Sequence, residues 1–478
     1  MRKTKIVATM GPATDSPEII RAMLMAGMDV ARFNFSHGMH DEIVGRVAAL
    51  RSACEETGRP VALLADTKGP EVRLGLFAGG RATLVAGQRF TLLSEPIDGD
   101  STKASVTYDG LARDVSPGNR ILLDDGLIEL VVEQVSEGNV ITRVINGGVV
   151  SDKKGVNLPD VKLNIPYISA KDRADLRFIS EVGFDFIAAS FVRSEADILQ
   201  LREELHRMGG DRIRIIAKIE NDEGVKNVES ILAASDGLMV ARGDLGVEMA
   251  FEELPILQKE LIKKAYRQGK NVITATQMLE SMIKNPRPTR AEASDVANAI
   301  YDGTSAIMLS GETATGDYPV VALATMARIA ERTEWDIDYR KRFHLSSYKP
   351  ESSVTNAISH ATVTTAHDLG AAAILTVTES GDTARNVSKF RPLCPIIACT
   401  PDPVVQRQLM LAWGVTPLLT TQVTAAAALF EHAIDAALLA GHIGSGDLLV
   451  LTAGVPLGFS GTTNMLKVHE VGERIPVL

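Results

Sequence analysis

A lysine and two carboxylates stand where they could act together on an anionic substrate. Lys218 and Glu220 end the apolar run IIAKIE, and their spacing on a strand points both side chains to the same face. Asp244 follows the next apolar run, in the segment ARGDLG. Two carboxylates from adjacent strand ends, without a nearby His or Cys, suit a hard cation such as Mg²⁺ or Mn²⁺. The alternative is a structural Lys–Glu ion pair that caps the core.

Other polar side chains also follow apolar runs, and two of them are arginines. Arg32 and Arg73 carry the planar guanidinium group that recognises phosphate, although arginines at such positions are often only salt-bridged. His37 is interpreted as a structural histidine rather than a base. The glycines of RGDLG would let backbone N–H groups approach an anion, although a plain strand-to-helix turn explains them equally. These residues predict a metal-assisted enzyme that acts on a small molecule with a phosphate and a carboxylate.

Eight apolar runs that alternate with amphipathic stretches predict the scaffold that positions these residues. The runs are KIVATM, DVARFNF, VALLADT, DFIAASF, RIRIIAKIE, GLMVAR, NVITATQ and SAIMLS. Runs that are apolar along their whole length indicate parallel strands buried on both faces. Eight such βα units predict an α/β fold with a closed (β/α)8 TIM barrel, whose chemistry lies at the carboxyl ends of the strands. The polar residues described above fall at those ends.

Two further regions interrupt or follow the barrel. Between residues 70 and 167 the chain has short β-type runs broken by Gly, Asp, Asn and Pro, which predicts a small β-barrel domain inserted after strand 3. Such an insertion could close as a lid that excludes water. A polar stretch after Trp335 is interpreted as a linker, and the chain beyond it predicts an open C-terminal α/β domain. The predicted domains are barrel residues 1–69 and 168–337, inserted residues 70–167 and C-terminal residues 338–478.

The overall composition excludes several classes of protein. The 478 residues carry a formal charge of −10 and only 5% aromatic residues, which argues against binding to nucleic acid or to a membrane surface. Three scattered cysteines indicate neither a disulfide framework nor a thiolate metal site. The sequence has no Ser–His–Asp or Cys–His pattern, which disfavours nucleophilic catalysis. Without a signal peptide or a run of about 18 apolar residues, the protein is expected to be cytoplasmic.

Several long segments, in order along almost the whole chain, resemble the blocks of the pyruvate kinase family. They are TKIVATMGPAT, DVARFNFSHG, DTKGPEVR, KIENDEGV, MVARGDLGVE, ATQMLESMIKNPRPTRAEASDVANAIYDG and IMLSGETATGDYP. The resemblance implies a glycolytic enzyme that transfers the phosphoryl group of phosphoenolpyruvate to ADP, giving ATP and an enolate that is protonated to pyruvate. It also implies Mg²⁺ or Mn²⁺ held by Glu220 and Asp244, K⁺ as a second cofactor, a mobile lid and a homotetramer.

The resemblance further implies roles for the cationic residues. Lys218 would stabilise charge on the transferring phosphoryl group and on the enolate oxygen. Arg32 and Arg73 would hold phosphate oxygens, and together with His37 they would contact the nucleotide.

Other residues would hold the substrate carboxylate and deliver the proton. By the same resemblance, Thr276 and the backbone of Gly243 and Asp244 would bind the carboxylate. Thr276 and Ser310 would belong to the water-linked path that protonates the enolate carbon.

A monovalent cation site is also implied near the ends of strands two and three. Its residues would be Asn34, Ser36, Asp66 and the backbone of Thr67. Family members with Glu at the position of Glu71 need K⁺ and members with Lys do not, because a built-in ammonium group can replace a bound cation. Glu71 therefore predicts K⁺ dependence.

The C-terminal segment TESGDTA resembles the family's loop for an effector phosphate. Its Thr378, Ser380 and Thr383 would bind phosphate oxygens of a sugar-phosphate or nucleotide effector. However, Asp382 stands where relatives with a sugar-phosphate effector usually carry Arg or Lys, and a carboxylate beside a phosphate lowers affinity. We therefore expect weak, altered or absent activation by fructose 1,6-bisphosphate. The alternative is an ordinary helix N-cap loop.

Two other functions are weighed against this one. A metal-dependent aldolase that forms a pyruvate enolate would use a similar Glu and Asp pair, but it does not explain the insertion, the K⁺-type residues or the C-terminal domain. A non-catalytic sensor or scaffold predicts loss of catalytic residues, whereas Lys218, Glu220, Asp244, Thr276 and Arg73 are all present.

Overall fold

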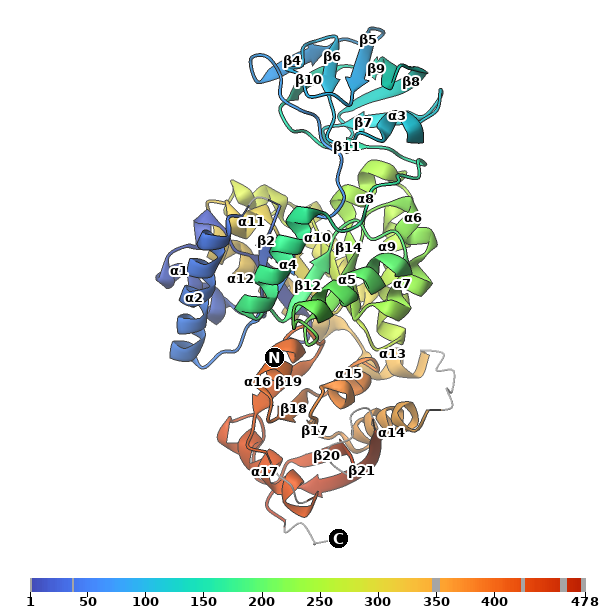
Figure 1. The fold of residues 1–478 in the computed structure, drawn as a ribbon. Helices are drawn as coiled ribbons and strands as arrows, with labels where there is room; N and C mark the ends of the chain where they lie inside the picture. The colour runs from blue at the N-terminus through green and yellow to red at the C-terminus, as the bar shows by residue number, and fades with distance from the viewer. Residues whose placement is uncertain (1, 37, 346–352, 423–425, 456–461, 474–478) are drawn as a thin grey trace.

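Three regions follow one another along the molecule, with a β domain at one end, a barrel in the middle and an open sheet at the other end (Figure 1). The structure is a computed structural model that describes residues 2–36, 38–345, 353–422, 426–455 and 462–473. Among these residues, no helix is both long enough and apolar enough to cross a membrane. The predicted domain limits 1–69, 70–167, 168–337 and 338–478 stay predictions.

The eight predicted parallel strands close into one barrel, which confirms the TIM barrel. They lie in the order β1-β16-β15-β14-β13-β12-β3-β2, and β2 pairs with β1 to close the circle. Every residue of β1, β3, β14 and β15 is buried, because helices cover the outside and side chains fill the inside. The strands are β1 (Lys5–Thr9), β2 (Val30–Asn34), β3 (Ala62–Asp66), β12 (Phe186–Ala189), β13 (Arg214–Ile219), β14 (Gly237–Ala241), β15 (Asn271–Ala275) and β16 (Ala306–Leu309).

Helices surround the barrel, and local sequence signals set their ends (Figure 1). A capping box of Thr289 and Glu292 starts α10, which ends at Gly303 with a φ of 99° that favours glycine. The covering helices are α1 (Pro17–Ala26), α2 (His40–Thr57), α4 (Ala170–Val182), α5 (Glu195–Arg207), α7 (Val228–Ala234), α9 (Leu254–Arg267), α10 (Arg290–Asp302) and α12 (Pro319–Asp336). Shorter helices are η1 (Pro12–Thr14), α6 (Asp222–Lys226), α8 (Arg242–Glu248), η2 (Glu280–Ile283) and α11 (Gly311–Ala314).

The predicted β domain is inserted between β3 and β12 and has its own hydrophobic core. A six-stranded sheet with the order β11-β7-β8-β9-β5-β6 and a two-stranded sheet of β10 and β4 surround that core. The strands are β4 (Arg81–Leu84), β5 (Arg89–Leu93), β6 (Lys103–Ser105), β7 (Arg120–Leu123), β8 (Ile128–Ser136), β9 (Asn139–Asn146), β10 (Gly148–Ser151) and β11 (Val156–Asn157), with one short helix, α3 (Leu111–Asp114). We call this region the lid.

The C-terminal region is the predicted open α/β sheet, with the strand order β19-β18-β17-β20-β21. Only β21 is antiparallel to its neighbour in this sheet. The strands are β17 (Ala373–Val377), β18 (Ile396–Thr400), β19 (Val415–Leu419), β20 (Leu448–Gly454) and β21 (Thr463–Glu470). The helices are α14 (Val354–Leu369), α15 (Asp382–Ser388), α16 (Pro403–Leu409) and α17 (Ala426–Leu439).

One local expectation was wrong, and one strand was missed. The stretch interpreted as a linker begins with α13 (Tyr339–Leu345), because Tyr339 packs on Trp413 at 5.4 Å and Phe343 stacks on His360 at 5.0 Å between ring centroids. Strand β19, which was not among the predicted strands, contains Pro417. It is tolerated there because β19 lies at the edge of the sheet, where the missing N–H group is not needed.

Candidate active site

Lys218 lies at the carboxyl end of β13 in a cluster of buried polar side chains. Its Nζ donates hydrogen bonds to Asp66 Oδ1 at 3.0 Å and Ser190 Oγ at 2.8 Å, and it lies 2.8 Å from Glu220 Oε1. Burial disfavours the ammonium ion, but the charges of Asp66, Glu220 and Asp244 outweigh it and raise the pKa of Lys218. The side chain therefore stays positively charged, which suits electrostatic stabilisation better than proton transfer.

Arg32 joins the same cluster from β2, the neighbour of β3. Its Nε donates to Asp66 Oδ2 at 2.7 Å, and its Nη1 donates to Thr9 Oγ1 at 2.8 Å. Burial would raise the pKa of Asp66, but Arg32 and Lys218 together lower it below its ordinary value. Asp66 is therefore an ionised carboxylate that aligns two cations at the barrel mouth.

The two predicted metal ligands, Glu220 and Asp244, are electrostatically coupled. Glu220 is 1% exposed, and burial, with a further contribution from Asp244, raises its pKa to about 7 against the opposing effect of Lys218. Glu220 Oε2 accepts a hydrogen bond from the Phe191 backbone at 2.5 Å. Both carboxylates retain lone pairs for a hard cation. In the described part of the chain, no three His, Cys, Asp or Glu side chains gather as a metal site, so other ligands would have to complete the coordination.

Thr276 and Gly243 meet at the ends of β15 and β14, as the resemblance implied. Gly243 N donates to Thr276 Oγ1 at 2.7 Å, and Thr276 itself has a φ of 68°, which is rare for a threonine. Arg242 donates to the Thr276 carbonyl at 2.6 Å and to Asp295 Oδ1 at 2.7 Å, so it supports this geometry from behind. Ser310 lies at the end of β16, where its backbone N–H donates to Glu312 Oε2 at 2.7 Å.

The residues implied for the monovalent cation gather at the ends of β2 and β3. Asn34 and Asp66 are register partners, and Asn34 Oδ1 accepts from the Ser36 backbone at 2.9 Å. The Thr67 carbonyl accepts from Ser190 Oγ at 2.6 Å, so it lies beside the same cluster. These residues offer carboxylate, amide, hydroxyl and carbonyl oxygens, the donors that suit a hard monovalent cation.

Arg73 lies apart from Arg32, at the base of the lid. Glu71 holds it in a bidentate ion pair with N–O distances of 2.7 and 2.8 Å, and the same carboxylate lies 3.3 Å from Lys68 Nζ. The hydrogen bonds to Glu71 raise the pKa of Arg73. Arg73 is thus salt-bridged here, the alternative that the sequence left open, and its phosphate-binding role stays a prediction.

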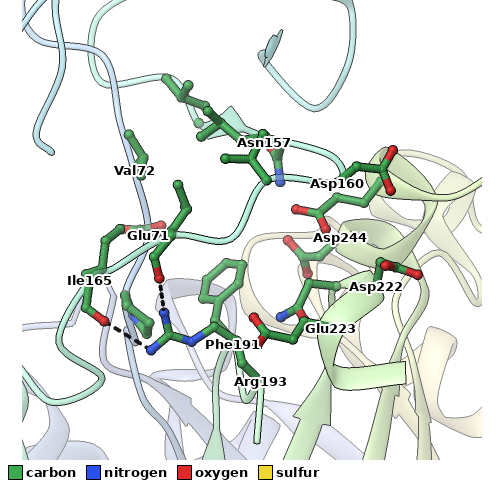
Figure 2. Close-up of a pocket in the computed structure, with 18 of the residues that line it drawn as sticks. Glu71, Val72, Asn157, Asp160, Ile165, Phe191, Arg193, Asp222, Glu223 and Asp244 are labelled. Atoms are coloured by element: carbon green, nitrogen blue, oxygen red, sulfur yellow. Dashed lines mark hydrogen bonds between the residues drawn. The ribbon is translucent and has the colours of Figure 1, made fainter. Parts of the chain in front are cut away.

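A cavity of about 610 Å³ separates the lid from the barrel mouth, and Figure 2 shows the residues around it. Asp244 and Phe191 line its barrel side, whereas Arg73 and Asp125 line its lid side. The lining includes eight carboxylates and five cations, so the cavity is strongly polar. Lys218, Arg32 and Thr276 do not line it, and they lie at the barrel mouth beyond it.

Two family models match the chain. The model of the pyruvate kinase barrel domain matches residues 1–323, and that of the pyruvate kinase alpha/beta domain matches residues 356–469. The chain belongs to the pyruvate kinase family. It is therefore a phosphotransferase, and the function predicted from the sequence is confirmed at this level.

Individual pyruvate kinases match over almost the whole chain. The enzyme of Clostridium acetobutylicum is 49% identical over 98% of this chain and 100% of its own. That of Geobacillus stearothermophilus is 52% identical over 99% of this chain and 81% of its own. The crystal structure of a pyruvate kinase from Cryptosporidium parvum matches with a TM-score of 0.92 and 39% identity, over 98% of this chain and 96% of that one.

In the loop for which an effector phosphate was predicted, the polar groups are already paired. Thr378 Oγ1 accepts from Gly381 N at 2.9 Å, and Ser380 Oγ donates to Asp382 Oδ2 at 2.8 Å. Arg385 donates to Asp382 Oδ1 at 2.6 Å. The remaining predicted residue, Thr383, shares a hydrogen bond of 2.8 Å with the Thr463 hydroxyl.

The sequence reasoning missed several residues that the structure brings to this pyruvate kinase site. Ser190 directly follows β12 and Thr9 is the last residue of β1, so the rule that found Lys218 would have found both. Asp125, on the lid turn after β7, faces the barrel, and burial followed by the charge of Asp244 raises its pKa. No sequence signal could have placed Asp125, because its position depends on how the lid sits. His37 lies outside the described residues.

Proposed function

We propose that the barrel mouth catalyses transfer of the phosphoryl group of phosphoenolpyruvate to ADP, giving ATP and pyruvate. The observation that carries this proposal is the position of Lys218, a buried cation between Asp66, Ser190 and Glu220, with Asp244 close enough to affect its pKa. A fixed positive charge beside two carboxylates suits a substrate whose phosphoryl group and enolate oxygen carry negative charge.

Glu220 and Asp244 are proposed to hold Mg²⁺ or Mn²⁺. Their oxygens fit a hard divalent cation, and the shortage of other carboxylate ligands fits a site that substrate oxygens and water complete. When bound, such a cation would neutralise phosphate charge and orient the substrate.

Lys218, Arg32 and Arg73 are proposed to bind phosphate oxygens, with Lys218 also facing the enolate oxygen. Because Asp66 and Glu71 already orient the two guanidinium groups, little side-chain entropy remains to be lost on binding. When the nucleotide binds, Arg73 would either contact its phosphate while still paired with Glu71 or leave that carboxylate to the neighbouring Lys68.

Thr276 is proposed to hold the substrate carboxylate with the backbone of Gly243 and Asp244, and to relay a proton with Ser310. Support comes from the direct hydrogen bond between Gly243 N and Thr276 Oγ1, which brings both groups to one side of the mouth. Asn34, Ser36, Asp66 and the Thr67 carbonyl are proposed to hold K⁺.

The lid is proposed to exclude water, since phosphoryl transfer to a nucleotide competes with hydrolysis. Such a lid has no place in the mechanism of an aldolase, and a scaffold would not need the buried Lys218 cluster. A homotetramer is proposed from the family alone.

We also propose that fructose 1,6-bisphosphate activates this enzyme weakly or not at all. The Asp382 carboxylate accepts hydrogen bonds from Ser380 and Arg385, the donors that an effector phosphate would need. Binding a phosphate there would require breaking these bonds and bringing two anions together.

The decisive experiment measures pyruvate formation from phosphoenolpyruvate and ADP with Mg²⁺, in K⁺ and in a tetramethylammonium control. We expect activity in the K⁺ buffer and none in the tetramethylammonium control, and a chelator that removes Mg²⁺ should abolish the activity in K⁺. Equal activity in both salts would contradict the K⁺ site, and no activity in either would contradict the proposed reaction.

A further inference from the structure

Residues 190–193, between β12 and α5, contact both the lid and the residues proposed for catalysis. Their first residue, Ser190, is 2% exposed and accepts a hydrogen bond from Lys218 Nζ at 2.8 Å. The next residue, Phe191, donates its backbone N–H to Glu220 Oε2 at 2.5 Å. Two consecutive residues of this segment, the 190–193 loop, therefore hold Lys218 and Glu220.

The far end of the 190–193 loop holds the lid. The chain returns from the lid to the barrel through residues 158–167, which we call the strap. Arg193 Nη1 donates to the Leu163 carbonyl and Arg193 Nη2 to the Ile165 carbonyl, both at 3.0 Å (Figure 2). Because the donors of a guanidinium group form a rigid planar fork, these bonds fix the strap in one orientation.

Arg193 is also tied to the barrel. Its backbone N–H donates to Asp197 Oδ2 at 2.9 Å, and its carbonyl accepts from Asn227 Nδ2 at 2.8 Å. Its side chain is 19% exposed and lies 3.6 Å from Asp197 Oδ1. Arg193 therefore joins the strap to the barrel, with its side chain bound to the strap and its backbone bound to barrel residues.

Both connections of the lid to the barrel reach the start of this loop. Tyr167, at the end of the strap, donates to the Ser190 carbonyl at 3.2 Å. At the other connection, a Cβ added to Gly69 would lie 2.7 Å from the same carbonyl oxygen, so the chain passes close against it. Phe191 has a φ of 54°, a conformation that an aromatic residue adopts only when its surroundings hold it there.

We propose that Arg193 is a positioning residue for the reaction. Its bonds to Leu163 and Ile165 fix the 190–193 loop, and the loop places Lys218 and Glu220 for catalysis while the strap is docked. This inference rests on the roles proposed above for Lys218 and Glu220.

The test compares Arg193→Met with the wild-type enzyme in two independent measurements. Losing both bonds should let the strap and the 190–193 loop move together, so hydrogen exchange should accelerate in peptides that span 158–167 and 190–193. A misplacement of about 1 Å at the catalytic residues should lower kcat/KM about 100-fold. Arg207→Met is the matched control, because Arg207 lies at the far end of α5, the helix that follows the loop. Among the described residues, its largely exposed guanidinium group pairs with Glu203 and Glu204 of the same helix.

Arg193→Lys provides a second variant if the methionine variant folds poorly. A lysine keeps the charge but cannot bond both carbonyls in the same fork, so it should give an intermediate loss of kcat/KM and intermediate exchange. Faster hydrogen exchange in the strap alone, with unchanged kcat/KM, would show that the strap does not position the 190–193 loop, and would overturn the proposal. Unchanged hydrogen exchange in both peptides would show that the Arg193 bonds do not fix the strap or the loop, and would overturn the proposal. If the wild-type enzyme itself transferred no phosphoryl group, the proposed function would be refuted. The exchange measurement would still show whether Arg193 fixes the strap and the 190–193 loop.

Discussion

Replacing Lys218 with methionine tests the central assignment, because methionine keeps most of the stem but removes the charge. In the wild type, Lys218 Nζ contacts Asp66, Ser190 and Glu220 within 3.0 Å. Asp66 would keep its ion pair with Arg32 at 2.7 Å, but among the described residues Glu220 would keep only the Phe191 backbone donor. Loss of stability and loss of turnover can therefore be predicted separately.

The stability cost comes mainly from Glu220. Breaking a buried ion pair costs about 3–5 kcal/mol when it strands a charge. Burial raises the pKa of Glu220 and Lys218 lowers it, so removing Lys218 should raise that pKa further and let the stranded carboxylate take up a proton more readily. The free energy of unfolding should therefore fall by about 3 kcal/mol, the lower end of that range.

The loss of turnover should be larger than this destabilisation explains. Removing one preorganised charge or donor from a transition state costs about 10²–10³ in kcat. Pyruvate formation measures kcat, and denaturant unfolding measures stability. Mn²⁺ should still bind, because Asp244 and Glu220 remain and the cation displaces any proton that Glu220 takes up. Lys259→Met is the control, since Lys259 is 59% exposed and pairs with Asp302 on the outside of the barrel. Near-normal turnover in a folded Lys218→Met enzyme would refute the role assigned to Lys218.

Three further predictions concern cations, effectors and pH. Glu71→Lys should keep activity in tetramethylammonium, because an ammonium group replaces the bound cation; continued dependence on K⁺ would contradict the site. Micromolar fructose 1,6-bisphosphate should leave the phosphoenolpyruvate saturation curve unchanged. If the curve is sigmoidal and the sugar phosphate makes it hyperbolic, the proposal that Asp382 weakens effector binding is wrong. Burial lowers the pKa of His367, whose Nε2 accepts a hydrogen bond from Leu393 N at 3.0 Å. Because the unfolded chain then binds the proton more readily than the folded protein, the free energy of unfolding should fall as the pH drops below about 6.5. Thermal unfolding at pH 7.5 and 5.5 should show a larger loss for the wild type than for His367→Gln, and equal losses would rule out this histidine.

The barrel could be predicted because its signals are local and repeat along the chain. An apolar run such as VALLADT is buried along its length, so its burial pattern matches its sequence. The errors arose where tertiary contacts decide the outcome. Tyr339 and Phe343 form a helix in a polar stretch because aromatic partners cover them, and Pro417 is accepted because its strand has a free edge.

The site was predictable only as far as side chains at strand ends reveal it. Lys218 and Asp66 could be found by that rule, but their direct contact past the intervening strand β12 could not. The bond from Phe191 to Glu220 uses a backbone N–H, which every residue except proline possesses, so no sequence pattern marks it. The pairing of Glu71 with Arg73 also depends on how the lid is connected.

The meeting of both lid connections at Ser190 has a consequence for the order of folding. Strands β3 and β12 are paired neighbours in the barrel, yet about 120 residues separate them along the chain. Closing the barrel across an unfolded connection of that length costs about 2 kcal/mol more loop entropy than closing a ten-residue loop. The insertion has its own core and leaves and re-enters the barrel at one point, beside the Ser190 carbonyl. If the insertion folds first, its ends are already together, and the barrel closes as though the connection were short.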